Sequence, residues 1–119
     1  MAKDDYNVLV FRILLYLYGC LKRQYSFENE GFYAALGTKV NEAYLSDILR
    51  NMSNDGLIKG AVFTHVWGDE YVLASSYDEL KITPDGIVYL QENSTMKKVK
   101  EMLLDSAEII VKLIKIVLL

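Results

Sequence analysis

The stretch "DILRNMSNDGLIKG" at residues 47–60 decides the fold, because it contains the end of a helix and the start of a strand. Gly56 predicts the stop, since glycine readily adopts the left-handed conformation that ends many helices. In such an ending the side chains at the positions of Met52 and Leu57 touch. This contact is predicted to pack the end of the helix against the start of the following strand. Apolar residues recur upstream at the spacing of one helical face: Leu45, Ile48, Leu49 and Met52.

Three helices are predicted up to this point. Asn41 is a good N-cap for the helix just described, and Glu42 is well placed in its first turn. A compact helix at about residues 30–36 precedes it and ends at Gly37. The first helix spans about residues 4–23, and Arg12 is its only charge between residues 8 and 18. A helix so apolar all round is predicted to be buried on more than one side.

A hairpin and two further helices are predicted after Gly56. A strand at about residues 57–66 is rich in β-branched and aromatic residues, "WGDE" supplies a turn, and "YVLAS" returns as its partner. Thr83 caps a fourth helix with Pro84 at its first position. The segment "NST" offers a new cap, and a final helix is predicted over about residues 95–119.

This order predicts one winged helix-turn-helix domain over residues 1–119. Its class is mainly α with a small antiparallel β-hairpin (α+β), and it has a long N-terminal helix and an additional C-terminal helix. Each junction has its own local chemistry, and all the junctions agree.

Composition limits the function classes. The 119 residues carry 13 basic and 16 acidic side chains, a formal net charge of −3, so a DNA-binding protein would need its positive charge gathered on one face. Cys20 is the only cysteine, which excludes an intramolecular disulfide and a cysteine zinc cluster. The N-terminus is unlike a signal peptide and no apolar run reaches the roughly 18–20 residues of a membrane span, so a cytoplasmic protein is expected.

The chain resembles the YjcQ-like winged-helix family of Gram-positive bacteria and their prophages. The resemblance covers roughly residues 5–104, and its most specific part is "ITPDGIVYLQENSTMKK" at residues 82–98. It implies the fold and a phage origin, and it supplies no catalytic residues.

A candidate DNA-reading face lies opposite the apolar stripe of the third helix. Asn and Arg side chains make bidentate contacts to adenine and guanine edges, and Lys contacts phosphates. Small Ala43 and Ser46 would permit close approach to the groove. The predicted readers are Arg50, Asn51 and Asn54, with Lys39 and Lys59 on phosphates.

Acidic residues argue against this interpretation. Asp47 offsets Arg50, Glu42 and Asp55 flank the helix, and the wing tip carries Asp69 and Glu70. Two hypotheses therefore stand: a DNA-binding or transcription-associated regulator, and a winged helix for protein–protein contact. A basic face across the third helix and wing favours DNA, whereas a neutral or acidic one favours protein.

Other chemistry has little support in the sequence. Lys97, Lys98 and Lys100 form the densest basic cluster, which is either a solvated helix face or an auxiliary phosphate contact. His65, between Phe63 and Trp67, lacks companion metal ligands. No local pattern makes Cys20 a nucleophile, and no glycine-rich phosphate loop follows a strand. We expect a non-enzyme without metal or cofactor.

The terminal helices predict a homodimer. From Ile109 to Leu119 all residues except Lys112 and Lys115 are apolar, and the first helix has a similar apolar excess. Such surfaces are expected to pack together and against a second copy, and a membrane-surface role for the tail is the alternative. The predicted interface residues are Leu9, Phe11, Leu15, Tyr18, Ile110, Leu113 and Val117.

Overall fold

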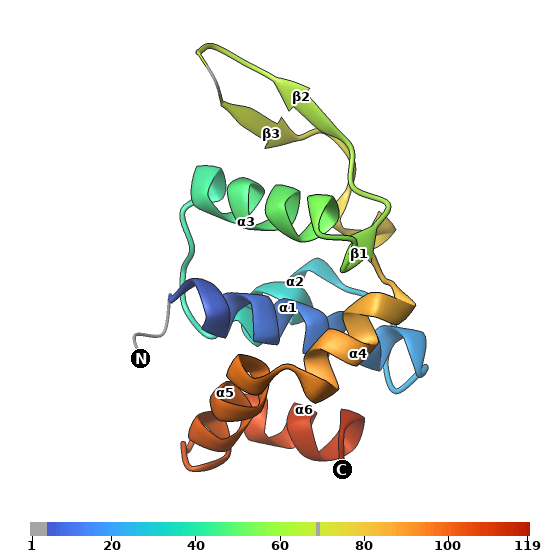
Figure 1. Cartoon of the computed structure of the whole chain (residues 1–119), viewed down its shortest axis with the longest axis vertical. Helices are drawn as coiled ribbons and strands as arrows, with labels where there is room; N and C mark the ends of the chain where they lie inside the picture. Colours follow the sequence, from blue (N-terminus) through green and yellow to red (C-terminus); the bar gives the residue numbers. More distant parts are fainter. Residues whose placement is uncertain (1–4, 69) are drawn as a thin grey trace.

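A computed structural model describes residues 5–68 and 70–119. Six helices and four short strands follow one another along this part of the chain (Figure 1). Their bounds are α1 Tyr6–Leu21, α2 Asn29–Leu36, α3 Glu42–Asn54, β1 Ile58–Lys59, β2 Phe63–His65, β3 Tyr71–Leu73, β4 Lys81–Ile82, α4 Pro84–Glu92, α5 Ser94–Leu104 and α6 Ile110–Val117, with a 3₁₀ turn at Tyr77–Glu79 before β4. The class is mainly α with a small antiparallel hairpin, as predicted, and α2, α3 and the hairpin follow the order of a winged helix-turn-helix.

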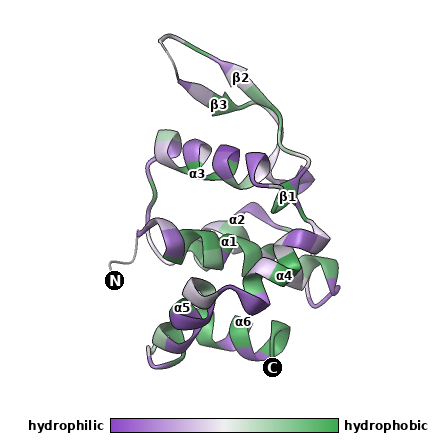
Figure 2. Ribbon diagram, in the orientation of Figure 1, coloured by the Kyte–Doolittle hydropathy of each residue, from purple (hydrophilic) through white to green (hydrophobic). Residues whose placement is uncertain are grey.

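Helix α1 is the centre of the molecule. Every residue from Val8 to Leu17 is buried, and the helix contacts α2, α4, α5, α6 and β4. Figure 2 shows hydrophobic residues along most of its length. The prediction of a helix buried on more than one side is confirmed.

The end of α3 has the predicted geometry. Gly56 adopts a left-handed conformation with φ of 76°. Its amide donates to the Ser53 carbonyl at 3.0 Å, and the Leu57 amide donates to the Met52 carbonyl at 2.9 Å. Met52 and Leu57 are both buried in the same core cluster, and the hydrogen bond between their backbones joins α3 to the chain that leads into the wing.

The predicted strand at residues 57–66 is divided in the structure. Gly60 has φ of 85°, and a Cβ there would overlap the carbonyl oxygen of Glu79. Before this glycine, β1 pairs with β4 so that Ile58 lies opposite Ile82, a pairing that the sequence pattern did not reveal. After it, β2 and β3 form the expected antiparallel hairpin, the wing.

The predicted C-terminal helix is also divided. Helix α5 ends at Leu104, and the Ser106 hydroxyl donates to the Leu103 carbonyl at 2.7 Å in the turn that follows. Helix α6 then folds back against α1 (Figure 1). A continuous helix would carry the apolar residues of α6 away from the core, so the turn permits their burial.

This turn covers part of the predicted dimer interface within one chain. Helix α6 packs against α1 and α5, and five of the seven predicted interface residues are buried there. A folded chain therefore cannot offer the fully buried ones to a partner. Leu9, Phe11, Leu15, Ile110 and Val117 are buried, whereas Tyr18 and Leu113 are half-buried.

A buried ion pair holds the α5–α6 turn against α1. Arg12 is 1% exposed, and its Nη2 lies 3.1 Å from Oε2 and 3.2 Å from Oε1 of Glu108. Its Nη1 donates to the Ala35 carbonyl of α2 at 3.3 Å. One guanidinium thus links α1, α2 and the turn before α6, and hydrogen bonds between charged groups are among the stronger polar contacts in proteins.

We predict that Gly56→Val lowers the free energy of unfolding by more than about 1 kcal/mol, because a β-branched residue is strained at positive φ. Nothing lies within 4 Å of the added Cβ, so the loss would come from the backbone and not from a clash. Urea unfolding measures it. Gly56→Asn is the control, since Asn tolerates this conformation, and equal stability of the Val and Asn variants would contradict the assigned helix ending.

We predict that Glu108→Gln costs about 1–3 kcal/mol of unfolding free energy, because it leaves the buried Arg12 charge without its carboxylate. The matched control is Glu101→Gln on the exposed side of α5, which should change stability by less than about 0.5 kcal/mol. Equal effects of the two substitutions would show that the pair does not hold the turn.

Candidate interaction surface

Helix α3 presents an uncovered polar face. Asp47, Asn51 and Asn54 are exposed along it, as the stripe of apolar residues on the opposite side requires. Lys39 is exposed in the turn between α2 and α3, and Lys59 is exposed on β1. The structure therefore leaves four of the five predicted DNA-contacting residues accessible, and these four do not include Arg50.

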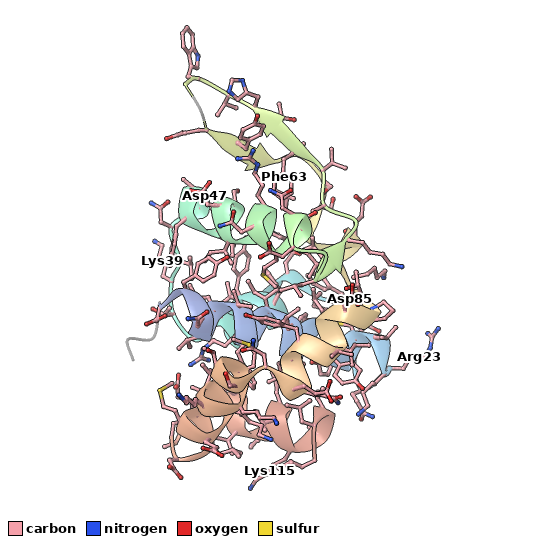
Figure 3. All side chains as sticks on the ribbon, in the orientation of Figure 1. Arg23, Lys39, Asp47, Phe63, Asp85 and Lys115 are labelled. Carbon is pink, nitrogen blue, oxygen red and sulfur yellow. The ribbon has the colours of Figure 1, made fainter. Side chains whose placement is uncertain are left out.

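Arg50 is engaged by the wing. Its guanidinium carbon lies 3.6 Å from the centroid of the Tyr71 ring on β3, and the side chain is half-buried. Arginine stacks well on aromatic faces, and this contact attaches the wing to α3. Figure 3 shows the wing lying over α3, with the labelled Phe63 on the wing side and Asp47 on the helix. The predicted role of Arg50 as a base reader conflicts with this contact.

Ser46 also faces the wing and not solvent. It is buried, and its hydroxyl accepts a hydrogen bond from the Leu73 amide at 3.4 Å. The expectation that Ser46 would allow close approach to a DNA groove is therefore wrong. Ser46 lies at the edge of the polar face of α3, where the hairpin packs. The sequence pattern did not show that the hairpin packs there.

The wing presents apolar surface and acidic charge. Trp67, at its tip, is 96% exposed, and Val62 and Val72 are also exposed. No Lys or Arg occurs between residues 60 and 80, and Glu70 is exposed near the tip. Asp69, the other predicted acid of the tip, lies outside the described residues. From the sequence, Trp67 is placed in a turn and beside His65 with no function assigned, although a tryptophan within a polar turn was itself a signal.

Charge is segregated along the chain. Residues 28–80, which contain α2, α3, the wing and the 3₁₀ turn, carry three basic and nine acidic side chains, a formal net charge of −6. The remaining residues carry ten basic and seven acidic side chains, a formal net charge of +3. The part of the chain that would meet DNA in a winged helix is therefore its acidic part.

The lysine cluster lies away from this surface. Lys97 and Lys98 are exposed and Lys100 is half-buried on α5, which packs at the opposite end of the molecule from the wing (Figure 1). These side chains cannot extend a contact made by α3 along the same duplex.

Cys20 and His65 were the other candidate reactive groups. Burial raises the pKa of the Cys20 thiol to about 11, a shift that nearby Lys81 only partly offsets, so the thiol stays protonated at neutral pH. The His65 ring lies beside the Tyr71 ring in a tilted arrangement, with ring centroids 5.0 Å apart. Among the described residues no group of three or more His, Cys, Asp or Glu side chains is placed to hold a metal ion. None of the described helices is long and apolar enough to cross a membrane.

Comparison with known proteins agrees with the motif at residues 82–98. The family model described as "YjcQ protein" matches residues 11–108. The chain belongs to the YjcQ family. This match includes α2, α3 and the wing, so the surface described above is part of the family domain. Neither the curated proteins nor the solved structures gave a match.

We predict that Tyr71→Leu loosens the wing, because it removes the ring on which Arg50 stacks. Backbone amides of β2 and β3 should exchange hydrogen faster, whereas amides of the buried α1 should not change. Tyr71→Phe keeps an aromatic face and is the control. Unchanged exchange in the Leu variant would show that the wing is held by other contacts, such as the bond to Ser46.

Proposed function

We propose that this YjcQ-family protein is a winged-helix module for protein–protein contact, and that α3 and the wing are its contact surface. The observation that carries the proposal is the formal charge of −6 on residues 28–80, together with a wing that has no basic residue. Phosphate neutralisation by Lys and Arg supplies much of the affinity of DNA-binding proteins, and this surface lacks it.

The exposed side chains of the wing support a protein partner. Trp67 is almost fully exposed at the tip, with Val62 and Val72 behind it. Tryptophan is enriched among the residues that dominate binding energy in protein interfaces, and it is highly buried on average in folded proteins. The hairpin thus presents an apolar anchor with acidic neighbours.

A DNA-binding or transcription-associated regulator is the second candidate. Asn51 and Asn54 are exposed on α3 and could read adenine edges, and Lys39 and Lys59 are exposed near the two ends of the helix. Arg50, the side chain best suited to guanine, is stacked on Tyr71. The balance of charge favours the protein partner.

We predict no duplex-DNA binding by fluorescence anisotropy at about 50 mM salt, where electrostatic association is stronger than at about 200 mM. Asp47→Lys combined with Glu70→Lys is the control, because it makes the same face less acidic and should gain salt-sensitive binding. Binding by the unmodified protein at the lower salt concentration would overturn the proposal.

A photoreactive amino acid at Val72 tests the protein contact directly. We expect it to form crosslinks to protein in cells, and we expect Trp67→Ala to remove them. The same amino acid at Val88, an exposed valine on α4, is the matched control and should form none of these crosslinks. Crosslinks to nucleic acid from position 72 would favour the second candidate.

A further inference from the structure

A cleft at the end of α1 combines apolar walls with two cations. It consists of two adjoining hollows of about 300 and 310 Å³ that share Cys20, Arg23 and Lys81. None of the side chains that line either hollow is acidic. The walls of the first are formed by Leu17, Leu21, Leu80, Ile82, Arg23 and Lys81.

Both cations of this cleft, Lys81 and Arg23, occupy positions that are unfavourable for the stability of the fold. Lys81 lies directly opposite Lys59 on the β4–β1 pair, and like charges at such positions repel. Arg23 has φ of 59°, a left-handed conformation that glycine adopts with less strain. An anionic partner would relieve the repulsion between the lysines, and Leu21, which is 54% exposed, would be covered by an apolar one.

The wing tip has the complementary chemistry. Trp67 offers an aromatic face on which a guanidinium or an ammonium can stack, and Glu70 offers a carboxylate for Arg23 or Lys81. The tip is acidic and the cleft is basic, and each has apolar surface that the described part of the chain leaves uncovered.

We propose that the wing tip of one copy binds the α1 cleft of a second copy, with Trp67 in the apolar part and Glu70 beside Arg23 and Lys81. This inference rests on the proposed function, because it names the partner as the same chain. It differs from the predicted interface of terminal helices, five of whose seven residues are buried within one chain.

The contact must form between copies. The molecule measures 41 Å along its longest axis, and in Figure 3 Arg23 projects at mid-height on the right, whereas the wing ends at the upper left. A wing therefore does not reach the cleft of its own chain. Two different surfaces meet in such a contact, so a pair of copies keeps one free wing and one free cleft, and further copies can add to form a ring or an open chain.

Sedimentation and intrinsic fluorescence of the purified protein test the proposal together. Trp67 is the only tryptophan, so its emission reports on this one position. We expect the average mass to rise with concentration from roughly micromolar to millimolar, with the emission shifting to shorter wavelength in parallel. Both changes should weaken at high salt. A monomeric mass with constant emission over this range would overturn the proposal.

Arg23→Gly separates association from folding. It removes a cleft cation and relieves the left-handed backbone, so the unfolding temperature should not fall while association weakens about tenfold or more. Lys98→Ala on α5 is the control, because it removes an exposed positive charge far from the cleft and should leave association unchanged. Equal association of the Arg23→Gly variant and the parent would overturn the proposal.

Mixing two variants tests the direction of the contact. Trp67→Ala keeps the cleft and Arg23→Gly keeps the wing, so each alone should associate weakly, whereas the mixture should form pairs with shifted tryptophan emission. No pairing in the mixture, or full association of Trp67→Ala alone, would exclude the wing-to-cleft contact. A monomer that also fails to bind DNA would overturn only this inference, whereas DNA binding at low salt would overturn the proposed function.

Discussion

Burial of α1 on every side is the constraint on which the rest of the structure depends. A helix with one charge in its central part must be covered by several elements, and α2, α4, α5, α6 and β4 all contact it. The exception within that helix is Arg12, whose charge is tolerable only because Glu108 and the Ala35 carbonyl surround it. The same residue thus fixes the position of α2 and of the turn that returns α6 to the core.

Local signals in the sequence were sufficient for the N-caps of α3, α4 and α5 and for the end of α3, but not for the division between α5 and α6. Asn41, Thr83 and Asn93 accept the amide hydrogen bonds expected of N-caps, and Gly56 ends α3 in the predicted way. These features depend on neighbouring residues only, so they are readable without knowledge of the tertiary structure.

Features that depend on distant partners were missed. The predicted strand is divided at Gly60, where the carbonyl oxygen of Glu79 leaves no room for a side chain. The β1–β4 pair joins segments more than twenty residues apart. Periodicity within α6 showed an apolar face but not what would cover it, and within the chain α1 and α5 contact this helix. At the candidate site, accessible Asn51 and Asn54 were predictable, whereas the stacking of Arg50 and the burial of Ser46 depend on how the wing packs.

The contact between α1 and α6 has a consequence for the order of folding. Arg12 and Glu108 are separated by 96 positions, so the pair closes nearly the whole chain into one loop. Contacts between such distant segments carry a high entropic cost and slow the formation of the native state. During synthesis on the ribosome, the side of α1 that α6 covers stays exposed to solvent until α6 has emerged. Transient binding by a chaperone could protect this apolar surface until then.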